Sequence, residues 1–264
     1  MCIRDSAYTW SKTLSTGTGL GDNLYPECAF SCTTKGGQTE SWIRYWYGPT
    51  TLDIPQVFVA SYTLNEPFLK NLRGVEGGFL SHWVLSGVTR FQSGQALTAT
   101  GSAGIGAVNP VGGALVLLAG GTTFTNRANI VSGQAIVDSV AQGGAAFGSG
   151  TCPASKICYI NPAAFGTTEG VSGSTTSGSI SATGVGSAPL GDIFGPGYYG
   201  WDLSLRKSFP IRESMNVTFQ WDAFNAFNRV NYSNPSTTIT SSTFGQITGA
   251  NPPRQMQFGL KFAF

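Results

Sequence analysis

The chain has 264 residues, of which 41% are hydrophobic, 12% aromatic and only 11% charged. Soluble domains carry about 25% charged residues, so this composition argues against a helical bundle, a coiled coil or a charged disordered tail. The 15 basic and 13 acidic residues give a net charge of +2, and without a basic run the chain is not expected to bind nucleic acid. Glycine, with 36 residues, is about twice as frequent as usual. These proportions favour an all-β fold.

The first ten residues, MCIRDSAYTW, show neither the apolar core nor the cleavage site of a signal peptide. A first strand is predicted where Tyr8, Trp10 and Leu14 alternate with polar residues. It is followed by a Gly-, Cys- and Thr-rich connection at about 15–51. A membrane helix is not expected, because the longest apolar run, residues 111–121, is short and broken by glycine.

Two further strands are predicted in the next part of the chain. Residues 56–64 place four side chains on one face: Phe58, Ala60, Tyr62 and Leu64. Residues 79–91 repeat the pattern with Phe79, Trp83, Leu85 and Phe91. Gly87 and Val88 interrupt the alternation there and predict a bulge. A long connection at 92–196 follows.

The clearest pattern lies in the last third of the chain, where residues 199–209, 215–223 and 255–264 alternate strictly between apolar and polar. Lys207 is the one interruption of the apolar positions. Residues 210–214, PIRES, predict a tight turn, and residues 228–254 a long connection. The charged side chains of the opposite face are Asp202, Arg206, Asp222 and Lys261.

Strict alternation is typical of soluble β-sandwiches and of membrane barrels. Three features favour the barrel: aromatic residues near the strand ends, charged residues that suit a wet lumen, and long connections that alternate with short ones. Each strand is also long enough to cross a bilayer at a tilt. The sequence therefore predicts an all-β, antiparallel up-and-down transmembrane β-barrel, of which six strands are present.

Several segments together resemble one family: YTWSKTL at residues 8–14, LSGVTRFQSGQALT at 85–98, NPAAF at 161–165, FGPGYYGWDLSLRKSFPI at 194–211, FQWDAFNAFNRVNY at 219–232 and FGQITGANPPRQMQFGLKF at 244–262. They resemble the C-terminal part of TonB-dependent outer-membrane receptors, specifically the Oar-like barrels of acidobacteria that often carry a carboxypeptidase-regulatory-like domain. The resemblance implies a 22-stranded barrel with an N-terminal plug and a TonB-contacting segment, located in the outer membrane of a Gram-negative bacterium.

On this interpretation residues 7–264 are the C-terminal portion of a receptor barrel. Residues 1–6, MCIRDS, are expected to be a non-native leader left by sequence assembly, with a genuine start codon as the alternative. Six strands cannot close a barrel, for which about eight is the minimum, so two strand edges are left unpaired. We therefore expect the isolated polypeptide to aggregate without detergent.

Catalysis has little support in the sequence. His82 is the only histidine, and on a strand beside Trp83 it is expected to be a polar lumen or interface residue rather than a base. The glycine-rich stretches at residues 17 and 101 contain GxG fragments without a surrounding βαβ unit, so they are expected to be loops. We predict no enzymatic activity, no catalytic residue, no cofactor and no metal site.

The cysteines and the C-terminus are the remaining candidate sites. Cys28 and Cys32 lie close together in one long loop, and Cys152 and Cys158 in another. Metal binding would need more ligands at each site, so two local disulfides in an oxidising compartment are favoured. The resemblance also implies that the terminal strand is read by the barrel-assembly machinery, through Phe258, Leu260, Phe262 and Phe264. An ordinary amphipathic strand is the alternative.

The leading functional hypothesis is a TonB-dependent receptor that imports a small ligand without covalent chemistry. Its expected partners are outer-membrane lipid, the assembly machinery, and the TonB complex through an N-terminal part not included here. A secreted β-rich module that binds glycans and a passive porin are the alternatives. Ligand contacts are expected from the long loops and the lumen, with Asn231, Tyr232 and Asn234 as candidates at a loop base, where a simple turn is the alternative.

Overall fold

The structure is a computed structural model that describes most of the chain. The described residues are 2–15, 32–33, 39–40, 47–65, 81–106, 108–111, 114–117, 123–136, 138–148, 150–166, 172–174, 179–181, 187–212 and 215–264. Among them the only helical element is a 3-10 turn, η2 (Pro162–Ala164). No helix in this part of the chain is long and apolar enough to cross a membrane.

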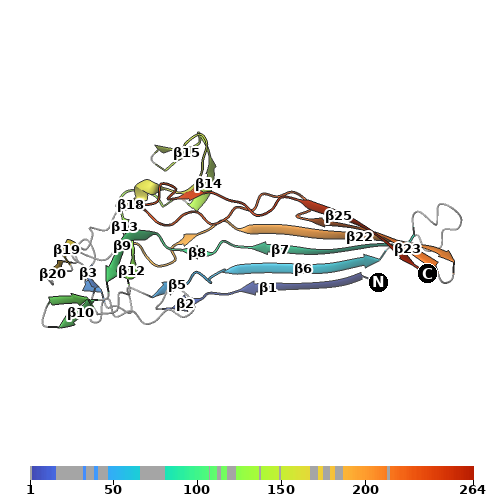
Figure 1. Ribbon diagram of the computed structural model, residues 1–264, viewed down its shortest axis with the longest axis horizontal. Helices are drawn as coiled ribbons and strands as arrows, with labels where there is room; N and C mark the ends of the chain where they lie inside the picture. Colours follow the sequence, from blue (N-terminus) through green and yellow to red (C-terminus); the bar gives the residue numbers. More distant parts are fainter. Residues whose placement is uncertain are drawn as a thin grey trace.

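Six long strands form one antiparallel sheet (Figure 1). They are β1 (Cys2–Trp10), β6 (Gln56–Asn65), β7 (Trp83–Gln92), β22 (Tyr198–Arg212), β23 (Met215–Phe224) and β25 (Gln255–Ala263). Each pairs with the next in chain order, so the sheet is an up-and-down meander whose edges are β1 and β25. The six predicted strands and their order are confirmed. The first of them ends earlier than predicted, at Trp10, so that Leu14 belongs to the short strand β2 (Leu14–Ser15). Phe79 lies outside the described residues. The residues of the expected leader continue β1, with Cys2 opposite Leu64 and Ser6 opposite Ala60.

Two local predictions about these strands are wrong. The register of β7 runs without interruption through Gly87 and Val88, so there is no bulge. Instead Gly87 lies opposite Tyr62, whose ring occupies the space where a Cβ of Gly87 would stand. The predicted turn at 210–214 is also shorter, because β22 continues to Arg212. A register shift between Pro210 and Arg212 accommodates the proline, which cannot donate to a regular ladder.

The connections separate by length between the two ends of the sheet. β6 and β22 end, and β7 and β23 begin, at the end of the sheet where β1 begins and β25 finishes, called here the turn end (Figure 1). The opposite end, called here the loop end, is where the strands flanking the three long connections, residues 11–55, 93–197 and 225–254, meet. This is the separation that the connection lengths predict.

Short strands fill the loop end. They are β2 (Leu14–Ser15), β3 (Cys32–Thr33), β4 (Thr39–Glu40), β5 (Gly48–Pro49), β8 (Ala96–Leu97), β9 (Thr100–Gly106), β10 (Val108–Val111), β11 (Ala114–Leu117), β12 (Thr123–Arg127), β13 (Asn129–Ile130), β14 (Asp138–Gln142), β15 (Ala146–Phe147), β16 (Gly150–Thr151), β17 (Ile157–Ile160), β18 (Phe165–Gly166), β19 (Ser172–Ser174), β20 (Ser179–Ser181), β21 (Ile193–Phe194) and β24 (Gln246–Ile247). Most pair in twos, and β14, β17 and β24 form a three-stranded sheet.

The main hydrophobic core of the described residues lies in the loop end and not under the long strands. Ile160 and Ile193 are fully buried there, and the Phe165 and Phe244 rings meet edge to face with centroids 5.7 Å apart. Phe244 comes from the β23–β25 connection, whereas the other three come from the β7–β22 connection. The two connections therefore fold together into one packed unit, which the Gly- and Ser-rich sequence did not predict.

The long strands, in contrast, bury few apolar side chains. Of the buried apolar residues in the described part, only Ala223 belongs to the six strands. The apolar side chains of both edge strands are exposed: Tyr8 by 63%, Trp10 by 75%, Phe258 by 70% and Leu260 by 69%. A soluble sandwich would bury these side chains against a second sheet. Among the described residues the other sheets have only two or three short strands and leave these side chains exposed. One side of the sheet is therefore suited to contact with an apolar solvent.

Candidate functional site

The register of the six strands assigns every apolar position of the alternating pattern to one side of the sheet, called here the apolar face. Tyr8, Phe58, Phe91 and Tyr199 form one row across it. The ring of Phe91 contacts the rings of Phe58, Tyr199 and Trp201 with centroids 6.0, 5.8 and 5.0 Å apart. This row stands at the loop end of the face.

On β7 and β22 the apolar face carries leucines between two aromatic ends. Leu85 lies between Trp83 and Phe91, and β22 runs from Tyr199 through its leucines to Phe209. Tyr199 and Phe209 are ten residues apart, which spans about 25 Å along the membrane normal at about 3.3 Å per residue and a tilt of about 40°. That is the height of the apolar band of outer-membrane barrels.

Lys207, the charge that interrupts the alternating pattern of β22, is buried inside an aromatic site near the turn end. Its side chain has no exposed surface, and its Nζ donates to the Ser81 carbonyl. The Nζ atom lies 5.1 Å from the ring centre of Phe209 and 5.5 Å from that of Trp83. Two ring faces and a carbonyl thus compensate the charge where the sequence pattern showed only an interruption.

The opposite side, called here the polar face, carries the four charged residues expected to face a lumen: Asp202, Arg206, Asp222 and Lys261. Asp222 is the centre of a network, since it accepts hydrogen bonds from Ser204 Oγ at 2.6 Å and from the amides of Gln220 and Gln257 at 2.9 Å. Arg206 donates to Gln220 at 3.4 Å. The polar groups of three neighbouring strands are therefore bonded to one another.

A pocket of about 350 Å³ opens across β6, β7, β22 and β23. Hydroxyl groups and carboxylates of the polar face line it: Ser61, Thr63, Ser86, Asp202, Ser204 and Asp222, with Val88 and Phe224 beside them. The hydroxyls of Thr63 and Ser86 lie 3.2 Å apart and form a hydrogen bond. Such a lining offers donors, acceptors and an aromatic surface to a polar ligand.

The last strand presents the predicted assembly signal at the edge of the sheet. Phe258, Leu260 and Phe262 lie on the apolar face opposite Trp221, Phe219 and Val217. Phe264 follows β25 and is 96% exposed. The residues are therefore accessible along a free strand edge, as recognition by another protein requires.

Deletion of Phe264 is expected to reduce the amount of protein in the outer membrane at least severalfold, because the assembly machinery would lose its terminal aromatic contact. Immunoblots of outer-membrane fractions measure this. Ala263 lies on the polar face, so the matched control is Ala263→Ser with Phe264 retained. Unchanged outer-membrane levels after the deletion would exclude a targeting role.

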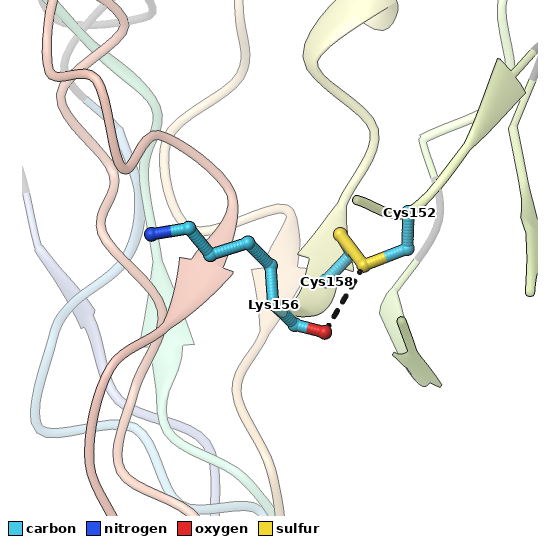
Figure 2. The surroundings of a disulfide bond; sticks show 3 residues. All are labelled: Cys152, Lys156 and Cys158. Atoms are coloured by element: carbon cyan, nitrogen blue, oxygen red, sulfur yellow. Dashed lines mark hydrogen bonds between the residues drawn. A yellow bond between two sulfur atoms is a disulfide. The ribbon is translucent and has the colours of Figure 1, made fainter. Parts of the chain in front are cut away.

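One disulfide closes the turn between β16 and β17. Cys152 and Cys158, the pair expected from their spacing, are joined with an S–S distance of 2.02 Å and a Cα–Cα distance of 5.8 Å. The Lys156 carbonyl oxygen lies 3.4 Å from the Cys152 sulfur. Figure 2 shows this carbonyl directed at the disulfide and the Lys156 side chain pointing away from it. Both half-cystines pack beside Phe147. Cys28 lies outside the described residues, and of Cys32 only the backbone in β3 is described.

Mass mapping of the protein from outer membranes is expected to find a peptide in which Cys152 is linked to Cys158. The double variant Cys152→Ser/Cys158→Ser should lower the local stability of the β14–β17 segment by about 2 kcal/mol, as the loop-closure entropy of so short a loop predicts. Hydrogen exchange of its amides measures this. Free thiols at both positions would contradict the prediction.

The three candidate residues at the loop base differ in role. The buried side chain of Asn231 accepts from Tyr199 N and donates to Tyr199 O, both at 2.9 Å. It therefore attaches the β23–β25 connection to the start of β22 and is not available to a ligand. Tyr232 packs against the loop-end core. Only Asn234 is exposed, and its amide donates to Gln95 Oε1 at 2.9 Å.

Asp192 in the loop end is an acidic site that the sequence did not indicate. It lines a cavity of about 390 Å³ together with Trp10, Asp53 and Phe194. Its buried Oδ1 atom accepts no hydrogen bond from the described residues. Burial raises the pKa of Asp192 to about 6, against the opposing effects of its own backbone hydrogen bond and of Arg127. A single aspartate in the segment Gly191–Ile193 carries no motif that could have revealed this.

The stability of the loop end is expected to depend on pH through Asp192. Because folding raises this pKa, the protonated carboxyl stabilises the fold, fully below about 3.8 and progressively less as the pH rises through about 6. In the variant Asp192→Asn this side chain is neutral at every pH, whereas the wild-type carboxyl is charged at pH 7.5. At that pH the backbone amides of residues 187–194 should therefore exchange more slowly in the variant than in the wild type. The difference should shrink at pH 4.5. An equal difference at both pH values would contradict this assignment.

The metal-binding side-chain types and the single histidine were the remaining candidates for chemistry. No group of three or more His, Cys, Asp or Glu side chains that could hold a metal occurs among them. The sequence predicted that His82 lies on a strand, and this is wrong. His82 lies in a bend one residue before β7, with a φ of 64°. Its Nδ1 lies 2.7 Å from Ser81 Oγ, and the strand begins at Trp83 because the bend at His82 ends regular pairing.

Comparison with known proteins gives one result. A family model described as an outer membrane beta barrel domain matches residues 4–257. Neither the curated proteins nor the solved structures contain a match. The matched range includes all of β6, β7, β22 and β23 and all three long connections.

Proposed function

Because the chain belongs to the outer membrane beta barrel domain family and is located in the outer membrane, we propose that it is part of a TonB-dependent receptor of the Oar-like type. In this function the loop end binds a small ligand from outside, and the polar face lines the path inward. No covalent chemistry takes place. The proposed partners are membrane lipid, the barrel-assembly machinery, and the TonB complex through an N-terminal plug.

The observation that carries this proposal is the folded loop end. A pore needs only connections that leave its opening free, whereas here two connections share a core, with Ile160 N and Tyr159 N both donating to Gly245 O at 3.0 and 2.8 Å. A disulfide between Cys152 and Cys158 fixes a further part. A preformed outer unit of this kind suits selective binding, because little ordering entropy is then lost when the ligand binds.

The polar face supports the same proposal. The pocket of about 350 Å³ across β6, β7, β22 and β23 lies between the loop end and the turn end. Its network around Asp222 is fixed by hydrogen bonds from three strands. Ordered hydroxyls and carboxylates in a lumen would give a polar ligand successive contacts on its way inward.

Uptake measurements on the native protein that contains this chain test the proposal. A TonB-dependent receptor should take up its ligand in cells with TonB and lose nearly all uptake when TonB is deleted or the proton gradient is collapsed. A passive porin would continue to equilibrate solutes under both conditions. The gene sequence upstream gives an independent test, since a plug domain and a TonB segment are expected there. Strands that directly follow a signal peptide would contradict the proposal.

A further inference from the structure

The segment after β23 turns back along the apolar face and widens its aromatic row. Ala226 N donates to Trp201 O at 2.8 Å, and the Phe227 ring meets the Trp201 ring edge to face at 5.2 Å. Phe227 is nevertheless 66% exposed and Val230 56%. Phe227 thus extends the apolar face at its loop end, where this face meets the outer boundary of the membrane.

Two arginines stand beside these apolar side chains. The guanidinium carbon of Arg229 lies 5.4 Å from the ring centre of Tyr199, which belongs to the apolar face. Arg254 precedes β25 by one residue and has the same strand parity as Met256, also on this face. Its Nη1 donates to Ala226 O at 3.4 Å. Both arginines are exposed.

Two asparagine side chains form hydrogen bonds with the main chain of the two arginines. Asn225 accepts from Arg229 N and donates to Arg229 O, both at 2.9 Å, and donates to Pro252 O at 3.4 Å. Asn228 accepts from Arg254 N at 3.0 Å. Both asparagines have positive φ, 49° and 52°, which asparagine tolerates better than most residues. The main chain of both arginines is thus fixed, and each side chain has its own contact, Arg229 with the Tyr199 ring and Arg254 with the Ala226 carbonyl.

We propose that Arg229 and Arg254 bind the phosphate of an anionic lipid in the outer leaflet, with Phe227 and Val230 in the region of its acyl chains. Exposed guanidinium groups match phosphate oxygens, because arginine donates in a planar fork. The exposed aromatic and aliphatic side chains of the same segment suit the interface between headgroups and acyl chains. Asp202, which accepts from Asn225 N at 2.9 Å, lies on the polar face and does not compete.

This inference depends on the outer-membrane location and not on the proposed transport, so the two can fail separately. A receptor that imports nothing can still bind lipid, and a working importer can lack a lipid site. Ligand uptake therefore tests one proposal, and lipid binding to the purified protein tests the other.

The test uses the native protein that contains this chain, purified from outer membranes in a neutral detergent. It is titrated with lipid A, with dephosphorylated lipid A and with inorganic phosphate, and binding is followed by native mass spectrometry. The double variant Arg229→Gln/Arg254→Gln should bind lipid A about 30-fold more weakly, as expected for two arginines near an anionic lipid. Its binding of dephosphorylated lipid A should equal that of the wild type.

Two further variants complete the test. Arg90→Gln is the matched control, because Arg90 lies over Tyr198 at 6.0 Å on the polar face and should not affect lipid A binding. Arg229→Lys/Arg254→Lys keeps both charges but loses the planar forks, so its affinity for lipid A should lie between those of the wild type and the glutamine variant. Wild-type affinity in the glutamine variant, or an equal loss in Arg90→Gln, would overturn the proposal. Displacement of lipid A by millimolar inorganic phosphate would overturn it as well, by indicating a site for free anions.

Discussion

Leu85→Arg is expected to destabilise the protein in a bilayer by about 2–4 kcal/mol, the largest effect of any single change on the long strands. Leu85 lies on the apolar face in one row with Leu64 and Leu205. Leu205 is near the middle of the span between Tyr199 and Phe209 of β22, so this row lies near the middle of the apolar band. An arginine there must either bring its charge into hydrocarbon or distort the surrounding lipid. Urea titration of the protein in lipid vesicles measures the loss, and outer-membrane levels should fall with it.

Ser86→Arg is the matched control for that prediction. Ser86 is the next residue of the same strand, at nearly the same depth, and lies on the polar face opposite Ser204. Its substitution removes the hydrogen bond with Thr63 but places the new charge near the carboxylate of Asp222. A loss below about 1 kcal/mol is expected. If the two variants were equally unstable, the assignment of the two faces would be wrong.

Gly94→Ala should detach the loop end from the sheet. Gly94 lies just after β7, and a Cβ at this position would overlap the carbonyl oxygen of Gly195, just before β22. Backbone cannot move aside as a flexible side chain can, so the β8–β21 pair and the hydrogen bond from Gly195 N to Gln95 O at 2.8 Å would be broken. We expect a loss of about 3 kcal/mol, measured as faster hydrogen exchange and proteolysis in residues 96–99 and 187–194.

Gly150→Ala is the control for the close approach at Gly94. No atom lies within 4 Å of the position where its Cβ would stand, and its backbone has an ordinary φ. It belongs to the same loop end, in β16. This variant should retain the stability of the wild type. Equal exchange rates in Gly94→Ala and Gly150→Ala would show that the junction tolerates a side chain.

The long strands could be predicted because their environment imposes a period of two. A residue such as Trp201 or Leu205 must face lipid and its neighbour must face water, so the pattern is readable from each strand alone. The same reasoning predicted that the connections separate by length. The bulge predicted at Gly87 was wrong. A glycine within a strand can mark a bulge or make room for a neighbouring side chain, and the sequence of β7 alone does not show the Tyr62 ring that lies over Gly87.

The loop end could not be predicted, because its contacts join residues far apart in the chain. Thr100 N donates to Thr237 O at 2.8 Å, and Ile239 N donates to Thr100 O at 2.9 Å. No local period marks Ile160 or Ile193 as core, since the strands around them have only a few residues. Asp192 became visible as a perturbed acid only once these segments were packed around it.

The same long-range contacts determine when the outer unit can form. Phe244 and Ile247 complete the core around Ile160 and Ile193, and both lie within the last 21 residues of the chain. Closing such distant contacts is slow compared with pairing neighbouring strands. The outer unit should therefore mature last, after the strands from β1 to β23 have paired. Until then Ile160 and Ile193 remain without their partners, so this is the stage at which a stalled chain would be most prone to aggregate.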